Sequence, residues 1–311
     1  MGGQRVGGDM GKQVTKRCHW VSQAYLKTFA ADERREKIWR FGKTDCEPEL
    51  KPIEKVAVKF HLYAPRSPAG DRDDAVERKL SELERWFDHP IWKALGTTDM
   101  DLTWEPLRKI LALIVATTYV RNPRQFDTWK NVHRQMVGEL SRFETLPTHM
   151  TIGAERRTID NSDWPLFRDA DDEDMKRAWN SHVASAGDIA PLLLGMRMVM
   201  VTAEEPVFIT SDHPVIVNHP SLLFKGLRDP ETTISLPVSP TRTLVLDNRH
   251  GEPDGVYYPL AEQNPAPWNL LQWRGSIEHM FSHRHPDEVC SELVADEDRM
   301  MAASQRRWIC E

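Results

Sequence analysis

Residues 104–120 read WEPLRKILALIVATTYV, a charged beginning followed by an apolar run. This spacing predicts an amphipathic helix whose apolar C-terminal half lies in the core. The apolar part, Ile110–Val120, is about half as long as the roughly 20 residues that a membrane-spanning helix needs. Asn122 and Pro123 follow, and they end or kink the helix because a proline disfavours a helical conformation at the residue before it.

The same periodicity predicts further helices on both sides of this stretch. Apolar residues recur at helical spacing over residues 74–87 and 124–143, and again over 175–194 after the acidic turn 169–174. A short helix near the N-terminus and a tryptophan-rich last helix are expected over residues 21–29 and 265–280. One face of the helix 124–143 is apolar and consists of Phe126, Trp129, Val132, Met136 and Leu140.

Other segments carry β-prone runs in place of the helical spacing. We expect strands or extended segments over residues 37–41, 55–63, 196–202, 206–210, 232–237 and 242–246. Residues 65–73 form a loop. Pro237 and Pro240 limit ladder hydrogen bonding, so they indicate a sheet edge or a crossing loop there.

Together these segments predict an α+β fold, in which a mainly helical N-terminal half packs on a small mixed or antiparallel sheet from the C-terminal half. Residues 1–18 are rich in glycine and charge, so a flexible leader is expected there. The chain shows no internal repeat and no low-complexity tract. We therefore expect a single α+β domain over residues 19–311.

Composition narrows the class of protein. The 311 residues are 40% hydrophobic, which is enough for a large core, and 41 Lys and Arg face 47 Asp and Glu, a net charge of −6. Such a surface has no general attraction for nucleic acid or anionic membranes, although a local basic groove is compatible with it. No signal peptide or membrane anchor is visible, so a soluble cytoplasmic protein is expected.

The four cysteines are scattered without paired spacing, at Cys18, Cys46, Cys290 and Cys310. In a cytoplasmic protein this favours reduced thiols over a disulfide framework, and it disfavours a zinc knuckle. A composite metal site made of Cys18, His19 and a distant histidine is a weaker alternative.

The first candidate site is the motif HWVSQAYLKTF, residues 19–29. His19 and Gln23 are four residues apart and share one face if the turn is already helical. That geometry suits a metal ligand with a partner that orients it, or a general base beside an amide that holds substrate. The alternative is structural: His19 caps the helix and Gln23 bonds to a neighbouring backbone segment.

Two carboxylates stand on the helix 74–87. Glu77 and Glu84 are two turns apart on roughly one face, about 10 Å along the axis, so one of them but not both can join a single metal site. Glu84 is the better candidate because Trp86 and Phe87 lie beside it. The alternative is a solvated charged face.

Arg121 projects from the end of the central helix, where a guanidinium can meet an anion. Planar bidentate donors are used to recognise phosphate and carboxylate groups. Equally, an arginine at this position can complement the helix dipole and the last carbonyls.

The second motif is FITSDHP, residues 208–214, where Ser211, Asp212 and His213 follow a β-prone stretch. The end of a strand presents polar side chains to a cleft, which makes Asp212 the strongest single candidate. His213 points to the opposite side in an extended chain. Ser211 and Asp212 can instead form an Asx or Ser turn. A serine hydrolase is disfavoured because no G-x-S-x-G elbow is present.

Several motifs in the same order resemble the bacterial family catalogued as domain of unknown function 4238 (DUF4238). They are residues 19–29, the helix with Glu77 and Glu84, Tyr119–Pro123, Phe208–Pro214 and Leu236–Pro240. The resemblance covers about residues 19–285 and implies one domain with His, Gln, Arg and Ser-Asp signature positions. It brings no activity. Trp20 stands where the family typically has Tyr or Phe, and Asn269 falls near its usual late Asn.

Two functions are compatible with these residues. The first is a metal-dependent hydrolase for a phosphodiester or nucleic-acid substrate, with bacterial defence as one setting. Its metal, Mn, Mg or Zn, is held by His19, Glu84 and Asp212, its further catalytic residues are Gln23 and Arg121, and its substrate-binding residues are Ser211 and Asn269. The second is a binding or protein-interaction module in which these residues form a structural network. An open pocket favours the first, and complete burial with every group paired favours the second.

Overall fold

The computed structural model describes residues 17–67, 69–152, 155–221 and 225–309 of the chain. Most of the predicted leader therefore lies outside the described residues. Its last two residues do not belong to a leader, because strand β1 (Arg17–His19) pairs antiparallel with β4 (Val58–Phe60) and Cys18 is fully buried.

The larger sheet has five strands in the order β12-β7-β11-β10-β9. Their bounds are Tyr257–Pro259, Arg197–Thr202, Arg242–Asp247, Thr233–Ser239 and Ile216–Asn218. Only β12 runs parallel to its neighbour, so the sheet is mixed, which is one of the two arrangements that the sequence predicts. The pairing of β9 ends at Ser235, which leaves β10 a neighbour on one side only at Pro237, as the two prolines indicate.

A second sheet joins the two halves of the chain. Its order is β3 (Glu49–Pro52), β2 (Lys37–Gly42), β13 (His279–Ser282) and β8 (Thr210–Ser211). The predicted strand 206–210 is wrong for all but its last residue. In this segment the backbone hydrogen bonds do not belong to a β-ladder, because the N–H groups of Val207 and Phe208 both donate to the carbonyl of Pro240.

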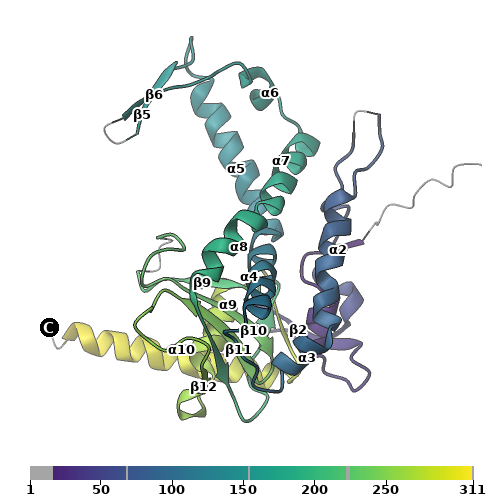
Figure 1. The fold of residues 1–311 in the computed structure, drawn as a ribbon, viewed down its shortest axis with the longest axis vertical. Coiled ribbons are helices and arrows are strands. Elements are labelled where there is room, and N and C mark those ends of the chain that lie inside the picture. Colours follow the sequence, from purple (N-terminus) through teal and green to yellow (C-terminus); the bar gives the residue numbers. More distant parts are fainter. Residues whose placement is uncertain (1–16, 68, 153–154, 222–224, 310–311) are drawn as a thin grey trace, which may run out of the picture.

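The central helix forms as predicted. α4 (Glu105–Val120) lies over one face of the five-stranded sheet (Figure 1), and its buried Leu107, Leu111 and Val115 belong to the same apolar cluster as Met198 and Leu244 of the sheet. The other helices are α1 (Gln23–Leu26), α2 (Ala75–Asp88), α3 (Pro90–Leu95), α5 (Pro123–Leu140), α6 (Trp164–Arg168), α7 (Asp172–Ala184), α8 (Ala186–Leu194), α9 (Ala266–Gly275) and α10 (Pro286–Ile309). Short 3-10 turns cover Lys27–Phe29, Ile53–Lys55 and Ala261–Gln263.

Three helical or extended expectations need correction. The predicted helix 265–280 ends at Gly275, and its last residues belong to β13, while α10 is a further helix that the sequence reading missed. Residues 175–194 form two helices separated at Ser185. Of residues 55–63 only β4 is a strand.

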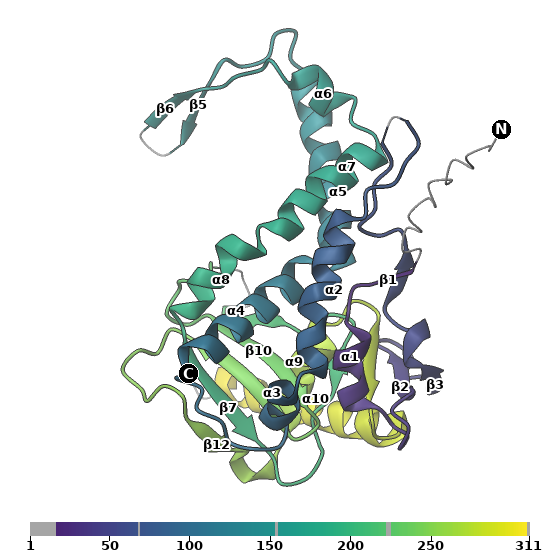
Figure 2. The same cartoon turned by 45° about the vertical axis from the view of Figure 1, so that its right-hand side comes forward.

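Helices α5 and α7 extend away from the rest of the molecule, with the hairpin of β5 (His149–Ile152) and β6 (Glu155–Thr158) at the far end (Figures 1 and 2). The predicted apolar face of α5 is present but largely uncovered: Trp129, Val132 and Met136 are each more than 40% exposed.

The expectation of reduced thiols is also wrong in part. Cys46 and Cys290 form a disulfide between Cα atoms 6.5 Å apart, whereas Cys18 is a free, buried thiol. Spacing cannot reveal this pair because the two residues are 244 positions apart. Among the described residues, no helix is long and apolar enough to cross a membrane.

Candidate functional site

Arg121 caps the C-terminal end of α4 and is buried, with its side chain only 3% exposed. Its Nε donates to the carbonyl of Trp20 at 2.6 Å, and a terminal nitrogen donates to Oε1 of Glu84 at 2.7 Å. The hydroxyl of Tyr63 donates to the carbonyl of Arg121 at 2.7 Å. The predicted Arg121 and Glu84 therefore meet, but as an ion pair that joins α4 to α2.

His19 and Gln23 also meet, as their spacing predicts. Nε2 of Gln23 lies 3.3 Å from Nδ1 of His19, and Nε2 of His19 lies 3.2 Å from the carbonyl of Glu54. An amide N–H can only donate and a carbonyl can only accept, so the ring carries its proton on Nε2. Burial lowers the pKa of His19, which keeps this ring neutral. Both ring nitrogens are thus engaged within the protein.

Glu77, which the sequence reading ranks below Glu84, has the more perturbed carboxyl. Burial raises its pKa to about 7, and its Oε2 is buried with no hydrogen-bond partner among the described residues. The thiol of Cys18 hydrogen-bonds to this carboxyl, and burial together with the charge of Glu77 raises the thiol pKa to about 11. We call the set Cys18, His19, Gln23, Glu77, Glu84 and Arg121 the Arg121 network.

Asp212 lies elsewhere and holds backbone. Its Oδ1 accepts from the N–H of Ile277 at 2.7 Å, and its Oδ2 accepts from the N–H groups of Glu278 and His279 at 2.9 Å each. The side chain is 3% exposed, and burial raises its pKa against the opposing effect of these bonds. The carboxylate is therefore already occupied by three donors that precede or open β13.

Ser211 and Asn269, the predicted substrate-binding residues, are buried and paired as well. The hydroxyl of Ser211 donates to Oε1 of Gln272 at 2.9 Å. The amide of Asn269 accepts from the N–H of Ile209 at 3.1 Å and donates to the carbonyl of Val207 at 2.9 Å. These side chains fasten α9 to the segment before Asp212.

The structure does not gather the expected metal ligands. His19 and Glu84 belong to the Arg121 network, and the carboxylate of Asp212 is turned to residues 277–279. Within the described parts of the chain, the one set of three His, Cys, Asp or Glu ligand atoms within 4.8 Å of one another is elsewhere, at His219, Asp229 and Glu231.

His213, next to Asp212, differs from all of these groups. Its Nδ1 lies 3.1 Å from the carbonyl of Gly275, so Nδ1 donates and Nε2 of the neutral ring is left as an acceptor. Nε2 is buried and has no hydrogen-bond partner among the residues that the structure describes. Burial lowers the pKa of His213, so the ring is a neutral base near pH 7. The ring stacks on Tyr119, with 6.3 Å between centroids.

Two cations, Arg124 and Lys43, lie near this ring or the backbone that it contacts. The charge of Arg124 lowers the pKa of His213 and also that of Lys43, in each case adding to burial. Lys43 donates to the carbonyls of Arg274 and Ser276, at 2.6 and 3.2 Å, which leaves one of its three N–H donors. Arg124 is exposed and forms no ion pair with a described residue. We call His213, Tyr119, Arg124 and Lys43 the His213 site.

The sequence favours Asp212 over its neighbour His213, whereas in the structure the carboxylate of Asp212 is paired with backbone and Nε2 of His213 has no partner among the described residues. In an extended chain Asp212 and His213 point to opposite sides, so one of them was expected to reach a cleft. Which one is free depends on the backbone of residues 275–279, and no local pattern carries that information.

Comparison with known proteins returns one result. A family model described as "Protein of unknown function (DUF4238)" matches residues 17–307. No curated protein and no solved structure matches the chain.

Proposed function

Since the chain belongs to the DUF4238 family, whose description assigns no activity, we propose from the geometry that it is a hydrolase acting on an anionic substrate of the phosphodiester class. The observation that carries this proposal is the unpartnered Nε2 of His213. A buried acceptor without a partner calls for an explanation, such as a catalytic role. Other buried atoms in the described parts of this chain also lack a partner, for example those of His283, but His213 is acted on by an arginine, Arg124, that forms no ion pair with a described residue.

In the proposed reaction His213 is the general base. Nε2 takes a proton from a water molecule, the water oxygen attacks phosphorus, and the bond to the leaving oxygen breaks. The alkoxide takes a proton from solvent and leaves as an alcohol, and the protonated ring returns its proton to solvent. The hydrogen bond from Nδ1 to the carbonyl of Gly275 holds the ring in the tautomer that leaves Nε2 basic. The lowered pKa supports this role, because the ring is unprotonated before the reaction.

Arg124 and the free donor of Lys43 bind the anionic phosphoryl oxygens. Two cations close together form a favourable position for an anion, although the charge of Asp212 also acts on Lys43, and a guanidinium matches phosphate geometry. Arg124 takes the part that the sequence assigns to Arg121, whose guanidinium is committed to Glu84 and Trp20. Because Nε2 is buried in the free protein, the proposal requires the site to open before water reaches it.

Asp212, Ser211 and Asn269 act as positioning residues. They fix the chain on both sides of His213 through residues 277–279, Gln272 and the backbone before β8. The proposal therefore needs no ion at His19, Glu84 and Asp212.

The setting is part of the same proposal. We place the protein in the cytoplasm, with nucleic acid as one polymer of the right class. The disulfide between Cys46 and Cys290 counts against that compartment, since disulfides are rare there.

A second candidate is an anion-binding module without catalysis. The burial of Nε2 favours it, because a base that stays shielded performs no chemistry. Both candidates bind a phosphate group at Arg124 and Lys43, and only the first turns over a phosphodiester.

One assay separates the two candidates. We expect the full chain to hydrolyse bis(p-nitrophenyl) phosphate in the presence of EDTA, and His213→Asn to lower kcat by about 100-fold or more. The control is His250→Asn, an exposed histidine whose loss should leave the rate unchanged. Phosphate binding without turnover would favour the module, and an unchanged rate in His213→Asn would refute the role of His213.

A further inference from the structure

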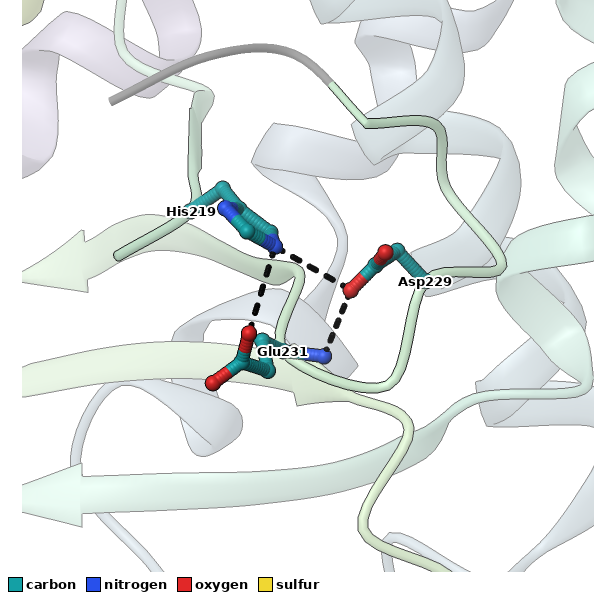
Figure 3. Close-up of side chains that lie close together, drawn as sticks. All are labelled: His219, Asp229 and Glu231. Carbon is teal, nitrogen blue, oxygen red and sulfur yellow. Dashed lines mark hydrogen bonds and ion pairs between the residues drawn. The ribbon is translucent and has the colours of Figure 1, made fainter. Parts of the chain in front are cut away.

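A cluster of ionisable side chains lies at the connection between β9 and β10 (Figure 3). Asn218 pairs with Thr233 in the ladder, so the residues just outside this pair are brought together. His219 directly follows Asn218, and Glu231 precedes Thr233 by two positions. Asp229 lies on the same connection and turns its side chain towards His219.

The three side chains converge on one point. Nε2 of His219 lies 3.1 Å from Oδ1 of Asp229 and 3.7 Å from Oε2 of Glu231. All three ligand atoms lie within 4.8 Å of one another. The side chain of His219 is 8% exposed, that of Asp229 29% and that of Glu231 67%, so the cluster has a buried floor and opens to solvent beside Glu231.

Residues 226–232 of this connection are held in place independently of these side chains. The amide of Asn248 donates to the carbonyls of Leu227 and Asp229, at 2.9 and 2.7 Å. The backbone N–H of Thr232 donates to the carbonyl of Asp229 at 3.1 Å, and its hydroxyl donates to Gly226 at 2.8 Å. Asp229 and Glu231 are thus presented by a braced segment and His219 by the residue directly after β9, which lowers the entropy cost of binding an ion.

We propose that His219 Nε2, Asp229 Oδ1 and Glu231 Oε2 bind one Zn²⁺ ion, with water as a fourth ligand. Zn²⁺ takes histidine nitrogen and carboxylate oxygen at about 2.0–2.2 Å, and tetrahedral ligands at that range lie about 3.3–3.6 Å apart. The two His219 distances bracket this range, so small side-chain adjustments complete the site. This inference is independent of the proposed hydrolase, because none of its residues belongs to the His213 site.

The competing role of His219 is a structural hydrogen bond. As it stands, Nδ1 lies 3.1 Å from the N–H of Ser221 and 2.7 Å from its hydroxyl, and Nε2 donates to Asp229. Zinc binding requires Nε2 to give up its proton. Nδ1 then carries one and donates to the hydroxyl of Ser221, and the backbone N–H of Ser221 must turn away because it loses its acceptor. That hydroxyl is the partner that orients a metal-bound histidine.

The test is calorimetric titration of the metal-stripped full chain, without a tag, with Zn²⁺. We expect one saturable site, a weakening of at least tenfold in Glu231→Gln, and loss of the site in His219→Gln. Glu231→Gln is the safer variant for folding because its side chain is mostly exposed. His250→Asn, a nearby exposed histidine outside the ligand set, should bind as the wild type does.

The outcomes separate cleanly. Equal affinity in the wild type and Glu231→Gln, or the absence of a saturable site in the wild type, would overturn the proposal. Co²⁺ in place of Zn²⁺ gives a second readout, since a tetrahedral site produces visible absorption that His219→Gln should remove. Hydrolysis measured in the same variants should be unchanged, so failure of the metal site and failure of the hydrolase remain distinguishable.

Discussion

The Arg121 network and the His213 site lie on two sides of one residue, yet they use their polar groups in opposite ways. Trp20 links them: its carbonyl accepts from Arg121, and its indole N–H donates to the carbonyl of Asp212 at 2.9 Å. In the Arg121 network nearly every polar atom is paired with another part of the protein. In the His213 site a basic nitrogen has no partner among the described residues.

The difference teaches where chemistry is to be sought. A buried charge that is paired holds two secondary-structure elements together, so a substitution there changes the stability of the fold. A substitution of an unpaired basic group beside cations should instead change ligand binding or turnover. Four residues that the sequence marks as catalytic do converge, but in the Arg121 network, whose groups are paired with one another. They are His19, Gln23, Glu84 and Arg121. The comparison therefore predicts opposite readouts for variants on the two sides.

The largest effect is expected for Glu84→Gln. The change leaves the guanidinium of Arg121, 3% exposed, without its counter-charge. Because Glu84 is 26% exposed, we expect a loss of about 3 kcal/mol, the low end of the range for removing one partner of a buried pair. Urea unfolding measures the loss. Glu82→Gln, an exposed neighbour on α2, should change the free energy of unfolding by less than about 0.5 kcal/mol. Equal free energies of unfolding in the two variants would mean that the ion pair of Arg121 with Glu84 does not stabilise the fold.

Next is Asp212→Asn, for which we expect a loss of about 2–3 kcal/mol of stability. An amide presents one acceptor oxygen where the carboxylate serves three backbone N–H groups, and hydrogen bonds to a charged group are each worth about 1.5–3 kcal/mol. Asp163→Asn, an exposed aspartate, is the matched control. A variant with wild-type unfolding but no hydrolysis would move Asp212 to the chemical side of the comparison.

The two regions also show what a sequence can and cannot predict. Local patterns were sufficient for α2, α4, β7 and β11, and for the meeting of His19 with Gln23, because each depends on spacing within a few residues. The role of Asp212 depends on backbone more than 60 positions away, in a strand that the sequence reading assigned to a helix.

The three expected metal ligands, His19, Glu84 and Asp212, are not brought together, and the reason is the same. His219, Asp229 and Glu231 meet only because β9 and β10 pair in one particular register, and no motif of that spacing draws attention to them. Charge patterns likewise did not separate Glu84, which meets Arg121, from Glu77, which keeps an unpaired oxygen.

A smaller effect is expected for Arg124→Ala, which tests the His213 site. Loss of this exposed cation should weaken binding of inorganic phosphate by about tenfold, the value of one modest charge-assisted contact, and leave the melting temperature unchanged. Calorimetric titration with phosphate measures the affinity. Arg85→Ala, exposed on α2 and remote from His213 in sequence, should bind as the wild type does. Equal affinities in both variants would remove Arg124 from the site.

The smallest effect is the dependence of stability on pH that Glu77 causes. Glu77 is the member of the Arg121 network that keeps a carboxyl oxygen without a partner among the described residues. Folding raises the pKa of its carboxyl from the usual 4.5 to about 7, so the folded state binds a proton more tightly than the unfolded state does. The stability that this proton contributes is present below about pH 4.5 and is lost as the pH rises to about 7.

Glu77→Gln removes the titrating group but keeps an acceptor for the thiol of Cys18. We therefore expect the melting temperature of Glu77→Gln, relative to the wild type, to rise by roughly 2–4 °C between pH 5 and pH 8. A difference that stays constant over this range would mean that Glu77 is charged in the fold. The Arg121 network would then hold two carboxylates against one guanidinium, and its pairing would be less complete than the comparison requires.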